Sequence, residues 1–125
     1  MHGFCLLVAG ALRATMPDSE LTLKWEHSVE KVEWQERYVV EHDRLRLVEA
    51  KIRGSGAGME APSGAVLRDG AWTWQPSVAP LQELRLTYST YTPDYRLCSA
   101  TTCTALAELA APLADGATVT VRACP

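Results

Sequence analysis

Alternation between apolar and polar positions dominates the chain and predicts a protein built mainly of β-strands. Residues 21–29 alternate with period two, as a half-buried strand does, and the same alternation returns over residues 34–40 and 44–49. Three positions on the apolar side of these predicted strands nevertheless carry polar side chains, namely His27, Glu36 and Glu49. The pattern therefore sets one imidazole and two carboxyl groups where apolar side chains are expected.

The predicted turns bring these three side chains together. If His42-Asp43 is a two-residue hairpin turn, Glu36 faces Glu49, and if residues 30–33 form a loop, His27 faces Glu36. The result is a predicted histidine–glutamate row, consisting of His27, Glu36 and Glu49, across three neighbouring strands. Facing carboxylates repel, so a buried row of this kind requires a proton, a cation or hydrogen-bond donors. The same register sets Val40 opposite Leu45 and Tyr38 opposite Leu47.

The histidine–glutamate row allows two interpretations. In the first it is a structural network, in which His27 is a satisfied core histidine and Tyr38 and Arg96 donate to the carboxylates. In the second the row opens into a pocket and binds a small polar ligand or a divalent cation. Carboxylate ligands favour calcium or magnesium, whereas the imidazole favours zinc or manganese.

The rest of the chain predicts further short strands and one helix. Strands are expected over residues 4–9, 71–74, 84–88, 96–98 and 117–122, and a helix over residues 103–109. We therefore expect residues 1–125 to form a single domain. Its fold class is mostly β, a compact antiparallel β-barrel or β-sandwich with at most one short helix.

Two loops stand out between these predicted elements. Gly54, Gly56 and Gly58 predict a sharp turn or a bulge, because the Lys-Ser/Thr of a phosphate-binding loop is missing. Residues 89–95 form a polar aromatic loop, which is typical of cleft linings and also of ordinary connections. Trp72 and Trp74 share one side of their predicted strand and are expected in core or rim packing.

Composition excludes some classes of partner. The net charge is −3, from 12 basic and 15 acidic side chains, so the positive footprint of a nucleic-acid-binding protein is missing. No apolar stretch approaches the length that spans a bilayer, so we expect no transmembrane segment in this chain. Residues 4–9 are apolar but lack a basic start, and we expect them to form the first strand rather than a signal peptide.

Four cysteines allow three pairings, and the preferred pairing is Cys5–Cys124 with Cys98–Cys103. Only four residues separate Cys98 from Cys103, which suits a local loop, and the other pair would then join the two ends of the chain. Two disulfides indicate an oxidising compartment. A zinc site is the competing interpretation, although the paired spacing of zinc ligands is missing, and free buried thiols are a third.

Several motifs together resemble those of an uncharacterised bacterial family, the domain of unknown function 1850. The matching motifs are His27-Ser-Val-Glu30, Glu36-x-Tyr38, Leu47-Val-Glu49, Gly54-x-Gly56-Ala-Gly58-Met59 and Tyr91-Thr-Pro-x-Tyr95-Arg-Leu97. Members of that family are commonly encoded beside the TAXI type of TRAP transporter, a solute importer with a periplasmic receptor. The resemblance therefore implies a transporter partner and a periplasmic or exported location, and it implies no activity. Met59-Glu-Ala-Pro62 departs slightly from the Met-Pro that ends the family's glycine loop.

Two classes of function follow from these observations. The favoured one is a non-enzymatic accessory domain of a TAXI-type TRAP transporter that binds a ligand or a protein partner. The alternative is a metal-dependent, hydrolase-like enzyme that uses His27, Glu36 and Glu49 with a divalent cation; no other cofactor is required by the sequence. A Ser28–His27 hydrolase is disfavoured, because neighbouring strand residues point to opposite faces. The candidate binding residues are His27, Ser28, Glu30, Glu36, Tyr38, Glu49, Tyr91, Tyr95 and Arg96, with Gly54, Gly56 and Gly58 in the adjoining loop.

Overall fold

A computed structural model of the protein describes residues 3–27, 32–53 and 62–125, which form two antiparallel β-sheets and one short helix. The first sheet has four strands in the order β2 (Ala11–Met16), β1 (Phe4–Val8), β11 (Thr118–Ala123) and β8 (Leu84–Thr87). The second has seven strands in the order β10 (Cys103–Ala105), β9 (Arg96–Cys98), β3 (Glu20–His27), β4 (Val32–Glu41), β5 (Arg44–Arg53), β7 (Ala71–Trp74) and β6 (Val66–Arg68). The helix is α1 (Leu106–Leu109).

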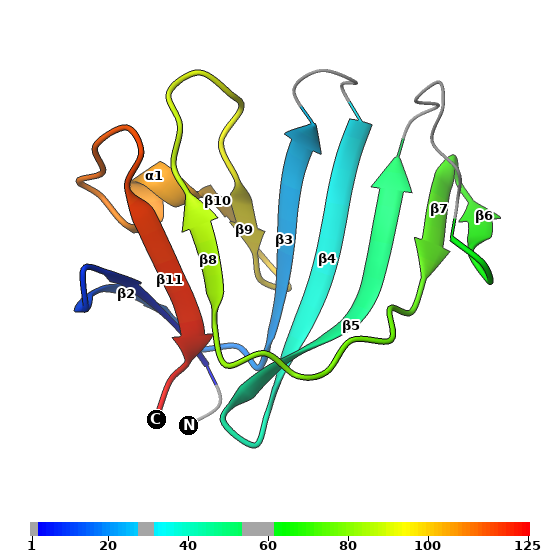
Figure 1. Cartoon of the computed structure of the whole chain (residues 1–125), viewed down its shortest axis with the longest axis horizontal. Coiled ribbons are helices and arrows are strands. Elements are labelled where there is room, and N and C mark those ends of the chain that lie inside the picture. The colour runs from blue at the N-terminus through cyan, green and yellow to red at the C-terminus, as the bar shows by residue number, and fades with distance from the viewer. Residues whose placement is uncertain (1–2, 28–31, 54–61) are drawn as a thin grey trace.

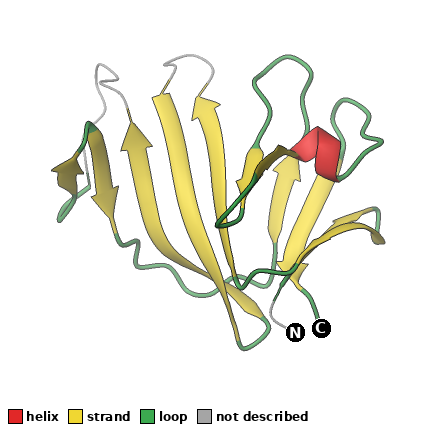
Figure 2. Cartoon of the chain, turned by 180° about the vertical axis from the view of Figure 1, so that it is seen from behind, coloured by secondary structure: helices red, strands yellow, loops and turns green. Residues whose placement is uncertain are grey.

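The two sheets pack as a sandwich-like domain, so the predicted fold class is confirmed in its sandwich form (Figures 1 and 2). No closed barrel forms in the described part of the chain, because each sheet keeps two edge strands. A single bridge between Leu45 and Leu81 connects β5 to the segment that leads into β8. Among the described residues, no helix is long and apolar enough to cross a membrane.

The hydrophobic core lies between the four-stranded sheet and one part of the seven-stranded sheet. Strand alternation sends one set of side chains inward from each sheet, and α1 adds Leu106. Each leucine that becomes fully buried contributes about 1.5–3 kcal/mol to folding. The fully buried members include Phe4, Leu6, Val119 and Val121 from the first sheet and Leu21, Leu45 and Leu97 from the second.

The hairpin between β4 and β5 follows the predicted turn. His42 and Asp43 have φ of 50° and 58°, the left-handed conformation that a two-residue hairpin turn of this kind requires at both positions. Val40 lies opposite Leu45, and Tyr38 opposite Leu47, as the sequence predicts.

The helix predicted over residues 103–109 is only partly correct. Residues 106–109 are helical, but Cys103 to Ala105 pair with β9 as strand β10. The disulfide between Cys98 and Cys103 holds these two short strands together, so pairing overrides the helical composition. Strands β2 and β6 were not predicted either. In β2 apolar and polar side chains do not alternate cleanly along the sequence, so no strand was predicted there. One of its apolar side chains, Leu12, is 59% exposed.

The predicted cysteine pairs are the ones found. Cys5 pairs with Cys124, and Cys98 with Cys103, which leaves no free cysteine among the described residues. The first disulfide joins β1 to the residue that follows β11, so it connects strands that are already neighbours in the sheet.

The seven-stranded sheet extends beyond the core. We call its inner face the side that carries Leu21, Leu23 and Tyr38, which belong to the core, and its outer face the opposite side. Strands β7 and β6 lie at the end of the molecule that is far from β2 and β11 (Figures 1 and 2). Inner-face residues of β4, β5 and β7 near that end, such as Trp34 and Trp74, are not part of the core cluster.

Candidate functional site

The predicted contact between His27 and Glu36 is wrong. Strand β3 ends at His27 and β4 begins at Val32, whereas the prediction put the connection at residues 30–33, so His27 pairs with Val32 and Glu36 pairs with Leu23. Leu23 and His27 are four positions apart, which corresponds to about 13 Å along β3. Only the backbone of His27 is described, and Ser28, Glu30, Gly54, Gly56 and Gly58 lie outside the described residues.

The predicted contact between Glu36 and Glu49 is also wrong. The pairing of β4 with β5 shifts by one residue between Tyr38 and Arg37, which leaves Val48 unpaired as a β-bulge. Glu49 therefore lies opposite Arg37 on the outer face, and Glu36 lies opposite Ala50. A shift by one residue moves a side chain to the other face of a sheet.

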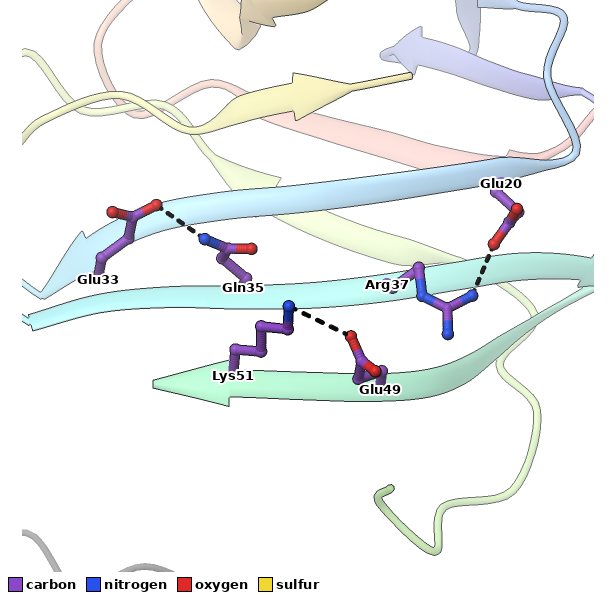
Figure 3. Close-up of polar contacts among 6 residues, drawn as sticks. All are labelled: Glu20, Glu33, Gln35, Arg37, Glu49 and Lys51. Carbon is purple, nitrogen blue, oxygen red and sulfur yellow. Dashed lines mark hydrogen bonds and ion pairs between the residues drawn. The ribbon is translucent and has the colours of Figure 1, made fainter. Parts of the chain in front are cut away.

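The histidine–glutamate row is therefore not assembled. The Glu49 carboxylate lies 3.8 Å from the Lys51 ammonium on the outer face (Figure 3). No group of three or more His, Cys, Asp or Glu side chains suited to a metal ion occurs in the described part of the chain. The hypothesis of a metal-dependent enzyme therefore lacks the cluster of His27, Glu36 and Glu49 that it required.

Glu36 instead lies alone among apolar neighbours on the inner face. The Tyr38 hydroxyl donates a hydrogen bond to its Oε1 atom over 3.0 Å, so one of the two predicted donors is confirmed. Burial raises the pKa of the Glu36 carboxyl above its ordinary value of 4.5, and the Tyr38 hydrogen bond lowers it by less. Burial and then the neighbouring Glu36 charge raise the pKa of Tyr38 well above its ordinary value of 10.

An aromatic row crosses the inner face beside Glu36; it consists of Tyr95, Trp25, Trp34 and Trp74. Trp25 and Trp34 are direct cross-strand partners, and their rings stack with centroids 5.9 Å apart and planes 11° apart. The Tyr95 ring lies 6.1 Å from Trp25 on one side, and the Trp74 ring meets Trp34 edge-on at 6.4 Å on the other. These distances are those of favourable aromatic pairs.

Glu36 lies next to this aromatic row rather than apart from it. Along the neighbouring line of cross-strand partners, Glu36 is followed by Ala50 and then by Trp74. The small Ala50 side chain is the only one between them, over about 10 Å of backbone separation. Burial, and then the charges of Asp94 and Glu36, raise the pKa of Tyr95 above its ordinary value of 10.

Trp34 has an unsatisfied donor at the centre of the aromatic row. Its Nε1 atom is buried and has no hydrogen-bond partner among the described residues. A buried N–H of this kind costs about 1–3 kcal/mol when it stays unpaired. A polar group that reached Nε1 would recover that free energy.

The outer face differs from the inner face, because it carries several pairs of opposite charges (Figure 3). Arg37 donates to Glu20 over 2.6 Å, Gln35 donates to Glu33 over 3.1 Å, and Arg96 lies 3.6 Å from Glu33. Arg96 therefore forms an ion pair with Glu33, and the prediction that it donates to Glu36 or Glu49 is wrong. A shallow outer hollow of about 140 Å³ is lined by Thr22, Gln35, Arg37, Glu49 and Lys51.

The predicted aromatic loop divides between two environments. Tyr95 is half-buried in the aromatic row, whereas Tyr91 is 87% exposed. The loop is anchored at both ends, since Thr90 donates to Asp115 and Asp94 accepts from the Ala107 amide at the start of α1. The exposed Tyr91 ring is therefore presented by a loop with fixed ends.

The family model described as Domain of unknown function (DUF1850) matches residues 21–106. The chain belongs to the DUF1850 family. The matched residues run from β3 to the first residue of α1, so they contain Glu36 and the whole aromatic row. Strands β1, β2 and β11 of the four-stranded sheet lie outside the match. The comparisons with curated proteins and with solved structures gave no match.

Sequence reasoning missed the aromatic row of this DUF1850 protein. The available signal was that Trp25 and Trp34 both occupy the apolar phase of adjacent predicted strands. With residues 30–33 as the loop, Trp25 would face Tyr38, whereas the connection lies two residues earlier and pairs Trp25 with Trp34. Trp74 was expected in core or rim packing, and its position near Glu36 depends on the bulge at Val48.

Proposed function

We propose that this DUF1850 protein is a non-enzymatic binding domain that holds a small ligand on the inner face of its seven-stranded sheet. The observation that carries the proposal is a half-buried carboxyl group, Glu36, beside a row of four aromatic side chains. Binding sites for small molecules combine large apolar and aromatic surface with a few polar groups that orient the ligand. The residues of this face fit that description.

Two features favour binding over catalysis. Glu36 has one hydrogen-bonding neighbour, Tyr38, whose raised pKa keeps it protonated at neutral pH. General acid–base work on a substrate normally uses two titratable groups with separated pKa values near the working pH. Among the side chains that the structure describes, the inner face offers Glu36 no such second group; the side chain of His27 is not described.

We propose further that the protein acts with a TAXI-type TRAP transporter in an oxidising, exported location such as the periplasm. The transporter partner is what the resemblance of the sequence motifs to that family implies, and the two disulfides are compatible with that compartment. Tyr91 is our candidate for the protein contact, because an exposed tyrosine on an anchored loop suits an interface anchor.

The ligand proposal is tested with a panel of amino acids, sugars, carboxylic acids and amines. We expect at least one compound to raise the melting temperature and to change tryptophan fluorescence, since Trp25, Trp34 and Trp74 line the face. Trp34→Leu and Trp74→Leu, each checked for folding by far-ultraviolet circular dichroism, should lose that response. Glu33→Gln on the outer face is the matched control and should keep it. A response that survives in both leucine variants, or no response to any compound, contradicts the proposal.

The partner proposal is tested by capture of the purified receptor component of a TAXI-type transporter. Tyr91→Ala should weaken capture about tenfold or more, as the loss of an interface anchor does, while the melting temperature stays unchanged. Leu12→Ala, which shortens an exposed side chain on β2, is the control. Equal capture by the wild type and Tyr91→Ala would remove Tyr91 from the interface.

A further inference from the structure

Charge is distributed very unevenly across the seven-stranded sheet. On β3, β4, β5, β7 and β9 the inner-face positions carry apolar or aromatic side chains, apart from Glu36 and from His27 at the end of β3, whose side chain is not described; Glu36 is the only carboxylate, lysine or arginine among them. The other charged side chains of these strands point outward or lie at the turn. Among the side chains that the structure describes, the inner face therefore has one negative charge and no positive charge.

The nearby cations are engaged elsewhere. Arg37, Lys51 and Arg96 all lie on the outer face, where they pair with Glu20, Glu49 and Glu33 over 2.6, 3.8 and 3.6 Å. A half-buried carboxylate without a countercharge either takes up a proton or attracts a cation from solution. Tyr38 satisfies only the Oε1 atom of Glu36 by hydrogen bonding and brings no charge.

The aromatic row favours the same kind of ligand. The face of a tryptophan or tyrosine ring carries a negative electrostatic potential and attracts a cation within about 6 Å of its centroid. Trp25, Trp34 and Tyr95 lie side by side next to the Glu36 position. An anionic ligand would be repelled by Glu36, and a neutral one would desolvate the carboxylate without neutralising it.

We propose that the ligand of the inner face is an organic cation, whose ammonium group lies against the Glu36 carboxylate and whose carbon atoms contact the aromatic row. This inference rests on the proposed function, because it assigns a ligand class to the same face. The ligand must therefore carry a positive charge, and its remaining atoms are defined only by their fit to the aromatic row. A cation held in this way needs no enzyme chemistry, which agrees with a carrier or sensor role.

Three probes of nearly equal shape test the role of charge. Choline, 3,3-dimethyl-1-butanol and 3,3-dimethylbutyrate share a bulky three-methyl head and differ in carrying a positive, no or a negative charge. We expect calorimetric titration of the full chain at pH 8 and low salt to show choline binding about tenfold tighter than the alcohol, with no binding of the carboxylate. This comparison uses only the wild-type protein and does not depend on a variant's folding.

Two variants test whether the Glu36 carboxylate supplies the negative charge that binds choline. Glu36→Gln keeps an acceptor for the Tyr38 hydroxyl and should lower choline affinity about tenfold while leaving the alcohol unchanged. Glu33→Gln removes the same charge from the outer face of the same strand and should change neither. Choline binding by the wild type should also weaken as the pH falls and Glu36 becomes protonated.

The outcomes separate this inference from the proposed function. Binding of the alcohol or the carboxylate as tightly as choline, abolished by Trp34→Leu, overturns the cation assignment and leaves the binding face standing. The same holds if the wider panel yields only neutral or anionic ligands for that face. If neither the three probes nor the panel binds, both proposals fail. Choline binding that Glu36→Gln leaves unchanged also overturns the assignment.

Discussion

At the scale of single residues, Glu36 and Glu49 show how strongly position decides the chemistry of one side-chain type. Both occupy apolar phases of their predicted strands, and both were expected on the inner face. Glu49 lies on the outer face beside Lys51, as an ordinary solvated ion pair, which adds about 0–1 kcal/mol to stability. Glu36 lies among aromatic rings, where burial raises its pKa.

The raised pKa of Glu36 makes stability depend on pH in a defined direction. The unfolded chain releases this proton near the ordinary value of 4.5, whereas the folded protein still holds it just above that value. The folded state therefore binds more protons in this window, and the free energy of unfolding falls as the pH rises through it. The contribution of Glu36 is fully present only below 4.5 and is lost above the folded pKa.

Glu36→Gln should remove this dependence. We expect urea unfolding between pH 4 and pH 8 to give a flatter profile for Glu36→Gln than for the wild type, with the variant at least as stable at pH 8. Glu33→Gln is the control and should follow the wild-type profile. Parallel profiles for the wild type and Glu36→Gln would mean that the carboxyl is not desolvated.

Tyr38→Phe should change the same profile in the opposite sense. The hydroxyl lowers the pKa of Glu36, so its removal should raise that pKa and extend the window over which stability falls. The loss of one hydrogen bond by a side chain that is 3% exposed should also cost about 1 kcal/mol. Carboxyl chemical shifts followed by pH titration measure the pKa directly, and an unchanged or lower value would contradict the assigned role of Tyr38.

At the scale of elements, the bulge in β5 decides which side chains share a face. Val48 is the extra residue, and the strand pairs regularly with β4 on both sides of it. Bulges bend a strand and increase its twist, and β5 curves strongly toward its hairpin end in Figure 1. This curvature lets Leu45 reach Leu81, with two backbone hydrogen bonds of 2.8 Å between them.

Deletion of Val48 tests this account. The remaining residues of β5 would then pair with β4 without a break, so Glu49 should stay opposite Arg37 and Ala50 opposite Glu36. We expect the fold to persist with a loss of about 1–3 kcal/mol, because the straighter strand packs less well against Leu81. Cross-strand nuclear Overhauser effects report the register. Contacts between Glu36 and Glu49 in the deletion variant would show that Val48 is not the extra residue of the bulge.

At the scale of the whole molecule, the two disulfides act over very different lengths of chain. Cys5 and Cys124 are 119 residues apart, and Cys98 and Cys103 only 5. The first therefore restricts nearly the whole unfolded chain, whereas the second restricts a short loop beside Thr22, Lys24 and Gln35 of the outer face. Both bonds would be kept in an oxidising compartment.

Loss of the long-range disulfide should cost more than loss of the short one. Chain-entropy arguments give about 5 kcal/mol for the Cys5→Ser, Cys124→Ser double variant and about 2 kcal/mol for Cys98→Ser, Cys103→Ser. Guanidinium unfolding of both double variants beside the oxidised wild type measures the difference. A larger loss for the short loop would mean that native-state packing of β9 and β10 outweighs the chain entropy.

The sequence by itself determined which residues form most of the strands and, for β3 and β4, which side of the sheet each side chain takes. The reason is that period-two alternation is a local property, since each residue's face depends only on its neighbours along the strand. An error of an even number of residues in a loop also preserves the face, so Trp25, Trp34 and Glu36 stay on the predicted side. The disulfide pairing was similarly accessible, because loop length constrains it.

Only the tertiary structure decided which side chains meet. The register between β3 and β4 set Trp25 opposite Trp34, and the one-residue bulge at Val48 moved Glu49 to the outer face. Neither the register between β3 and β4 nor the position of the bulge can be read from local periodicity, because register reflects pairing and packing energies summed over whole strands. The candidate site is therefore made by contacts between strands: an aromatic row and a lone carboxyl group in place of the histidine–glutamate row that alternation alone predicted.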